Sequence, residues 1–223
     1  MMQGHPPVQP SAAPGVRLDS ALRVQCRVVH ALVCREILTR FGRHNVGFMW
    51  LFLEPMLFTV GVIGLWTLAS STHGSNLPIA AFAITGYSSV LLWRNGATRC
   101  ANAITPNRGL LFHRNVRVAD LFFARLVLEI AGATMSLFVI CGLFIAFGGM
   151  EWPRDVLTMA GGWVLLAWFA CGLGFVVGAI SERSEVAARL WHTFTYLLFP
   201  LSGAAFMVDW LPQSLQSIAL WVP

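Results

Sequence analysis

The stretch VLTMAGGWVLLAWFACGLGFVVGAI, residues 156–180, decides the class of fold, because it contains no charged residue. An α-helix rises about 1.5 Å per residue, so a helix of this length crosses a hydrocarbon layer about 30 Å thick. The apolar run is continuous, whereas a membrane-spanning β-strand alternates apolar and polar residues. A helix also satisfies its own backbone hydrogen bonds, as a segment exposed to lipid must. The stretch therefore predicts a transmembrane helix.

The whole chain has the composition of a membrane protein. Its 223 residues are 57% hydrophobic and only 11% charged, which is too apolar for a soluble domain of this size. Five windows are long enough to cross a bilayer, namely residues 47–70, 78–93, 121–148, 156–180 and 190–208. We therefore expect an all-α, polytopic membrane helix bundle with five spans.

The arginines predict the orientation of these spans. All 15 basic residues are arginines, and only Arg154 lies between the third and fourth spans. The others precede the first span or lie around the connections between spans two and three and between spans four and five. Basic residues are retained on the cytoplasmic side of a membrane. We therefore expect a multi-pass protein of the cell membrane with a cytoplasmic N-terminus.

The chain divides into three predicted regions. Residues 1–16, with four prolines, are expected to form a disordered cytoplasmic tail. Residues 17–46 are expected to form a cytoplasmic interface helix on the anionic membrane surface. Its apolar stripe has helical spacing and consists of Leu22, Cys26, Val29, Val33, Ile37 and Phe41. A helix of a small soluble domain is the alternative. Residues 47–223 would form the transmembrane domain.

The cytoplasmic connection 94–120 has the mixed character of a docking loop. Pro106 and Gly109 interrupt it around a short amphipathic turn. Apolar residues 110–112 stand beside Arg108, Arg114 and Arg117, a combination suited to binding a protein partner. A positively charged loop that only marks topology is the alternative.

Three ionisable residues fall inside predicted spans: Glu54, Arg125 and Glu129. An unpaired charge at the bilayer centre costs at least about 2.5 kcal/mol, so such residues face protein or water and find partners. One interpretation is a structural cluster, with Arg125 and Glu129 four residues apart on one helix face and Glu54 opposite them. The other is that they line a cytoplasm-facing canal. Arg125 is the first candidate partner of Glu54.

The segment RFGRHNVGFMWLFLEP, residues 40–55, joins the interface helix to the first span. Arg40, Arg43 and His44 are expected at the lipid headgroups, and Trp50 is expected to anchor the span near the interface. Pro55 removes one backbone donor, so it predicts a local bend at Glu54.

The sequence lacks the residues of several catalytic sites. Without a lysine it cannot contain the P-loop motif G-x-x-x-x-G-K-[ST], and it has no HExxH, aspartate cluster or GxSxG motif. The five cysteines have no metal-binding spacing and are expected to be free thiols. We expect no catalytic residue, no metal site and no cofactor in this chain.

Several segments together resemble the inner-membrane permease of ATP-binding-cassette exporters of capsular polysaccharide. They are Arg40–Gly47 with Trp50 and Leu53–Pro55, Thr85–Tyr87, Trp93–Asn95, Asn107–Val116, Phe123–Arg125 and Glu129–Thr134. The resemblance implies a type-2 exporter permease fold with six spans, of which this chain shows five. It also implies a cytoplasmic coupling helix at about residues 105–114. The ATPase-coupling residues would be Thr105, Asn107, Arg108, Leu110, Leu111, His113 and Arg114.

The resemblance further implies the function and the partners. The chain would be the non-catalytic permease that moves lipid-linked capsular polysaccharide across the inner membrane of a Gram-negative bacterium. It would act with a second copy of itself, a separate dimeric ATPase that binds Mg-ATP, a periplasmic co-polymerase and an outer-membrane channel, and with no nucleic acid. A permease for another glycan, such as lipid-linked O-antigen, is one alternative. A secondary transporter is another, although no internal repeat is visible.

Overall fold

The computed structural model describes residues 18–41, 45–70, 79–112 and 116–201, and these residues contain no strand. The all-α prediction is therefore confirmed for the described chain. In order, the elements are α1 (Leu18–Phe41), α2 (Asn45–Ser70), α3 (Ile79–Ala101), the 3₁₀ helix η1 (Thr105–Phe112), α4 (Val118–Ala146), α5 (Val156–Arg183) and α6 (Glu185–Leu201).

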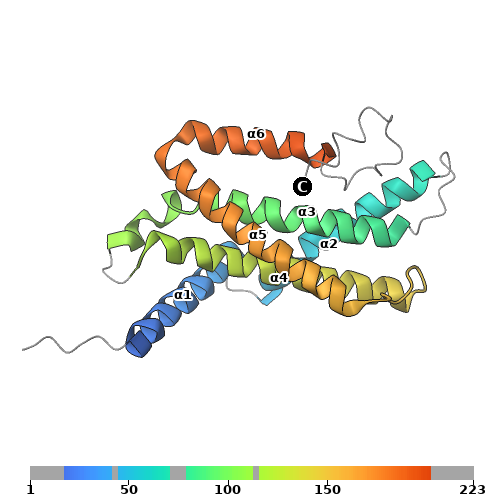
Figure 1. Ribbon diagram of the computed structural model, residues 1–223, viewed down its shortest axis with the longest axis horizontal. Coiled ribbons are helices and arrows are strands. Elements are labelled where there is room, and N and C mark those ends of the chain that lie inside the picture. Colours follow the sequence, from blue (N-terminus) through green and yellow to red (C-terminus); the bar gives the residue numbers. More distant parts are fainter. Residues whose placement is uncertain (1–17, 42–44, 71–78, 113–115, 202–223) are drawn as a thin grey trace, which may run out of the picture.

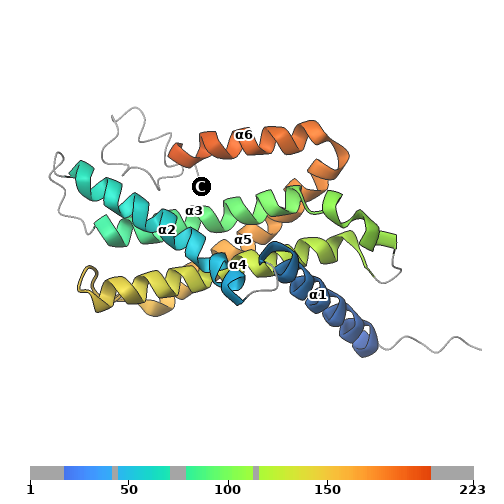
Figure 2. The same ribbon diagram turned by 180° about the vertical axis from the view of Figure 1, so that it is seen from behind.

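Helices α2 to α5 form a bundle of long, roughly aligned helices, and α1 projects from one end of it at an oblique angle (Figure 1). Helix α6 folds back along α3 after a tight corner at the end of α5 (Figures 1 and 2). Both views place α1, η1 and the α5–α6 corner at the same end of the bundle. The arginine-rich segments of the chain therefore gather at one end.

Among the described helices, α4 and α5 are long and apolar enough to cross a membrane. Only 44% and 22% of their most apolar windows are buried inside the protein. The core helix of a soluble protein would hide such a surface, whereas here Val164, Leu165 and Trp168 of α5 point outward. These two helices match the predicted spans 121–148 and 156–180. The count of five spans stays a prediction.

The core consists of three apolar clusters, each centred on α4. Ile84 of α3 packs against Leu137 and Ile140 of α4, with Ile63 of α2 beside them. Phe122 and Leu126 of α4 pack with Cys100, Cys171 and Phe175. Leu32 of α1 packs against Leu121 and Ala124 of α4. All five cysteines are free thiols, as expected.

Helix α5 approaches its neighbours closely through Gly174 and Gly178. The two glycines are four residues apart, the small-xxx-small spacing that allows close helix packing in membranes. A Cβ atom at Gly178 would lie 2.7 Å from Cζ of Phe122, and one at Gly174 would lie 2.9 Å from Cδ2 of Leu126. Both partners belong to α4. The glycines therefore allow α5 to pack against this face of α4.

We expect Gly178→Leu to destabilise the bundle by about 1–3 kcal/mol, because the new side chain must displace the buried ring of Phe122. The fraction of detergent-solubilised protein that stays monodisperse after heating measures this change. Gly172→Leu is the matched control, since a Cβ at Gly172 meets no atom within 4 Å. Equal stability of the two variants would contradict this packing.

Helix α1 lies where the interface helix is predicted, but it contacts the bundle through a partly different face. The residues turned toward α4 include Gln25, Leu32, Glu36 and Arg40, and Leu32 is buried. Leu22 and Cys26 of the predicted stripe are exposed instead. Val33 of the stripe packs beside the cluster of Leu32, Leu121 and Ala124, so the packing face overlaps the apolar stripe only in part.

Candidate functional site

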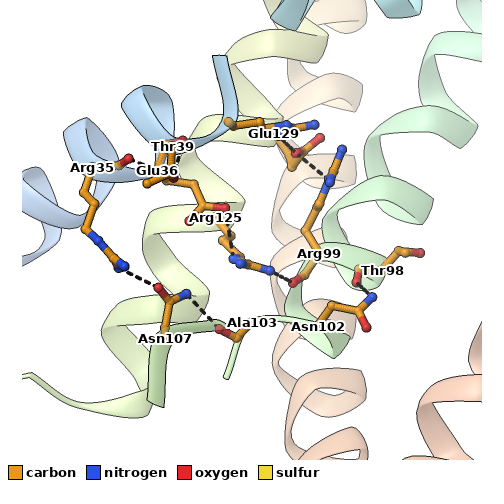
Figure 3. Close-up of polar contacts among 11 residues, drawn as sticks. Arg35, Glu36, Thr39, Thr98, Arg99, Asn102, Ala103, Asn107, Arg125 and Glu129 are labelled. Atoms are coloured by element: carbon orange, nitrogen blue, oxygen red, sulfur yellow. Dashed lines mark hydrogen bonds and ion pairs between the residues drawn. The ribbon is translucent and has the colours of Figure 1, made fainter. Parts of the chain in front are cut away.

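The candidate site is a polar junction where α1, η1, α3 and α4 meet (Figure 3). We use the name polar junction for Arg35, Glu36 and Arg40 of α1, Arg99 of α3, Asn107 of η1, and Arg125 and Glu129 of α4. Four arginines face two glutamates in this group. The junction therefore carries an excess of positive charge among helices that also pack through apolar residues.

Glu129 is the acidic centre of the junction. Its side chain is 9% exposed and forms an ion pair and a hydrogen bond with Arg40 of α1. Its Oε1 atom lies 3.2 Å from Nε of Arg99 on α3. One carboxylate thus joins three helices, and both of its partners lie outside its own helix.

Arg125 forms the second centre, one helical turn earlier on α4. Its Nε atom lies 3.3 Å from Oε1 of Glu36 in an ion pair. Its Nη1 atom donates a hydrogen bond of 2.7 Å to the backbone carbonyl of Arg99, at the end of α3. This guanidinium therefore links α1 to α3 through α4 (Figure 3).

Asn107 attaches η1 to the same network. It is buried, and its Oδ1 atom accepts a hydrogen bond of 2.6 Å from Nη1 of Arg35. Its Nδ2 atom donates a hydrogen bond of 2.8 Å to the backbone carbonyl of Ala103. Since each end of the amide is satisfied, Asn107 fixes η1 to α1 on one side and to the end of α3 on the other.

A further polar contact holds the N-terminal half of α1. Gln25 donates a hydrogen bond to Asp120, which also accepts a hydrogen bond of 2.8 Å from the backbone N–H of Arg117 at the start of α4. Between this contact and Glu36, Leu32 packs with Leu121 and Ala124. Polar and apolar contacts therefore alternate along the α1–α4 interface.

The buried ion pairs bind the helices together specifically rather than strongly. The free energy needed to remove two charges from water offsets most of their mutual attraction, so a buried ion pair adds little to stability. Removing one partner is far more costly, because the other charge is then left unpaired in an apolar setting. Displacing one helix of the junction would break these pairs, so α1, η1, α3 and α4 are constrained to move together.

The predicted coupling residues divide into two sets on η1. Asn107 is buried, and Leu110 and Leu111 pack inward against the cluster of Leu32, Leu121 and Ala124. Thr105 and Arg108 are exposed. Phe112 is 91% exposed, the largest value among the exposed large apolar side chains of the described residues. The outward surface of η1 therefore consists of Thr105, Arg108 and Phe112.

The remaining predicted site residues do not join the junction. Glu54 is exposed on α2, and the partner of Arg125 is Glu36 rather than Glu54. Trp50 is half exposed on α2, and α2 continues as a helix through Pro55. Arg43, His44, His113 and Arg114 lie outside the described residues.

Arg35, Glu36 and Arg99 are members of the junction that sequence reasoning missed. Glu36 and Arg40 are four residues apart on α1, a spacing typical of a pair within one helix. In the structure each instead binds a residue of α4. The sequence did contain a signal for pairing between the two helices. Arg125 and Glu129 are four residues apart, like Glu36 and Arg40, but with the charges in the opposite order.

Among the residues that the structure describes, no group of three His, Cys, Asp or Glu side chains is placed to hold a metal ion. The chemistry of the polar junction is that of charge pairing between helices.

Comparison with known proteins places this arrangement in context. Residues 27–223 match the family described as ABC-2 type transporter. The chain is 46% identical over 203 residues to the capsule polysaccharide export inner-membrane protein CtrC of Neisseria meningitidis serogroup B, covering 91% of this chain and 77% of that protein. It is 42% identical, with the same coverage, to the capsule polysaccharide export inner-membrane protein BexB of Haemophilus influenzae. Identity to the polysialic acid transport protein KpsM of Escherichia coli is 25%, covering 92% of this chain and 79% of that protein.

Proposed function

Because the chain belongs to the ABC-2 type transporter family, we propose that it is the membrane-spanning, non-catalytic subunit of an ATP-driven exporter of capsular polysaccharide. The observation that carries this proposal is the 46% identity, over 91% of the chain, to a protein named for capsule polysaccharide export. The exporter would act in the bacterial inner membrane, where the relatives are named as residing.

The proposed assembly contains two copies of this chain and two copies of a separate ATPase that binds Mg-ATP. A periplasmic co-polymerase and an outer-membrane channel would complete the path of a lipid-linked polysaccharide. The N-terminus, α1 and η1 would face the cytoplasm, where the ATPase lies. The gathering of α1, η1 and the α5–α6 corner at one end of the bundle supports this orientation, because arginine-rich segments stay on the cytoplasmic side.

In the proposed cycle, η1 receives the movement of the ATPase through its outward surface of Thr105, Arg108 and Phe112. The contacts of the polar junction support this role. Asn107 ties η1 to Arg35 of α1, and Arg125 ties α1 to the end of α3. A displacement of η1 would therefore move α1 and the ends of α3 and α4 as one unit, and so alter the packing of the bundle.

The test is complementation. A bacterium of a capsulate species that lacks its own capsule-export permease and ATPase is given this chain together with a candidate partner ATPase, and surface capsule is measured with a capsule-specific antibody. We expect surface capsule to return only when both proteins are present and the ATPase can hydrolyse ATP.

Two outcomes would contradict the proposed function. One is capsule at the surface with a hydrolysis-deficient ATPase, which would mean that ATP does not drive the export. The other is capsule retained inside the cell although both proteins reach the membrane and co-purify. An unchanged lipopolysaccharide profile serves as the control that the cell envelope is otherwise intact.

A further inference from the structure

A polar cavity of about 260 Å³ lies between α3 and α6. Arg94, Asn95, Thr98 and Arg99 of α3 and His192 and Tyr196 of α6 line it. Helix α6 lies beside α3 in both views of the fold, and the pair is joined by a hydrogen bond of 3.1 Å from Nε1 of Trp191 to Oγ1 of Thr98. The cavity is therefore part of the packing of two helices and not a surface irregularity.

The lining of this cavity contains two arginines and no acidic residue. Arg99 already pairs with Glu129 of the polar junction at 3.2 Å. The guanidinium carbon of Arg94 instead lies 5.0 Å from the centre of the Tyr196 ring, as a cation–π contact. Among the described residues Arg94 has no carboxylate partner, so within this part of the chain no acidic side chain balances its charge.

The neutral groups of the cavity are suited to a hydroxylated ligand. Asn95 offers an amide, and the hydroxyl of Thr98, which accepts a hydrogen bond from Trp191, still has a proton to donate. The ring of His192 is oriented by a contact of 3.3 Å between its Nε2 atom and Nδ2 of Asn102. Tyr196 supplies an aromatic face. A cation beside neutral donors and an aromatic ring is the combination that binds an acidic sugar.

The position of Arg94 also favours a ligand. Arg94 stands seven residues before the end of α3 at Ala101, so it lies about 10 Å along the helix from that end. Its side chain is half-buried, and a half-buried cation is stabilised by water or by a bound anion. A larger cavity, of about 470 Å³, lies between α5 and α6, but its lining is mainly apolar and contains no charged residue.

We propose that the cavity between α3 and α6 binds the carboxylate of an anionic sugar residue in the exported polysaccharide. The proposal rests on the proposed function and makes it more specific. Arg94 binds the anionic group, and Asn95 and Thr98 bind neighbouring hydroxyls. The phosphate of a phospholipid headgroup is also an anion that pairs with arginine, so the experiment separates these two ligands.

The experiment measures binding by titration calorimetry to the full chain in phosphatidylcholine nanodiscs. The probes are a sialic acid oligomer, a galacturonic acid oligomer and a neutral maltooligosaccharide of equal length. We expect at least one acidic oligomer to bind and the neutral one to bind at least about tenfold more weakly. Arg94→Gln should lower the affinity for the acidic oligomer by about tenfold or more, which is the loss expected for one charge-assisted contact. Arg94→Lys, which keeps the charge, should retain most of the affinity.

Arg154→Gln is the matched control, because Arg154 is an exposed arginine in the α4–α5 connection. It should bind like the parent. Binding of neither acidic oligomer, equal binding of the neutral oligomer, or an unchanged affinity in Arg94→Gln would each overturn the proposal. Loss of copurifying phosphatidylglycerol from Arg94→Gln in native mass spectrometry, with oligomer binding intact, would assign the cavity to a lipid headgroup and also overturn it.

Capsule complementation separates this proposal from the function on which it rests. If the chain is an export subunit and the cavity does not bind the polymer, the parent and Arg94→Gln restore surface capsule equally. If the chain is not an export subunit, the parent itself fails to restore capsule. The expected result is a parent that restores capsule and an Arg94→Gln variant that reaches the membrane, binds the ATPase and exports less.

Discussion

Glu129→Gln is expected to destabilise the protein by about 1.5–3 kcal/mol, because it removes the buried carboxylate that pairs with Arg40 and Arg99. The side chain of Glu129 is 9% exposed and that of Arg40 is 19% exposed, so water replaces the lost partner poorly. Arg99 contributes less to this cost, since its side chain is 42% exposed and solvent screens its charge. The shift in the midpoint of detergent-induced unfolding measures the effect.

Glu185→Gln is the control for this substitution. Glu185 pairs with Arg189 at 3.8 Å, but both side chains lie almost entirely in solvent, so the same chemical change should leave the midpoint unmoved. Combining Arg40→Gln with Glu129→Gln should cost less than the two single changes added together, because no charge is then left unpaired between these residues. A Glu129→Gln variant as stable as the parent would show that the junction does not hold α1 on α4.

Phe112→Asp is expected to weaken the complex with the partner ATPase by at least about 30-fold while leaving the fold intact. An exposed aromatic residue at the centre of an interface is a typical hot spot, worth about 2 kcal/mol or more. Phe112 is 91% exposed, so its replacement removes little packing within this chain. Copurification of the ATPase with the tagged permease, and the affinity of the two purified proteins, measure the effect.

Phe147→Asp is the matched control. Phe147 is 84% exposed and directly follows the last residue of α4. Phe112 lies a few residues before the first residue of α4. The two aromatic residues thus lie at opposite ends of one helix of 29 residues, about 40 Å apart. Equal loss of ATPase binding in both variants would point to a general defect and contradict a docking role for η1. Leu111 is unsuitable for this test, because it packs in two apolar clusters.

The sequence was sufficient to predict the all-α fold and the two most apolar helices. Residues 121–148 and 156–180 are so apolar that the composition of each segment alone predicts a long helix. The ends of α4 and α5 lie within a few residues of these ranges. The short helical element inside 94–120 was predicted as an amphipathic turn around Pro106 and Gly109, and the family resemblance implied a helix at about residues 105–114; η1 spans Thr105–Phe112.

The contacts between helices could not be predicted in the same way. Arg125 was the first candidate partner of Glu54, since it was placed only about one helical turn shallower in the membrane, yet its partner is Glu36 on α1. Which acid reaches it depends on where α1 lies, and that is determined by packing among Leu32, Leu121 and Ala124 rather than by local pattern. The inward direction of Leu110 and Leu111, and the outward direction of Phe112, likewise depend on which helices surround η1.

The central claim is that η1 docks on the ATPase through Phe112, and site-specific photocross-linking tests it most directly. A benzophenone amino acid replaces Phe112 in one variant and Phe147 in the other, each is expressed with the ATPase, and the products of irradiation are identified by mass spectrometry. We predict a permease–ATPase cross-link from position 112 and none from position 147. A cross-link from position 147, or an ATPase that copurifies with the complex but never cross-links to position 112, would contradict the account.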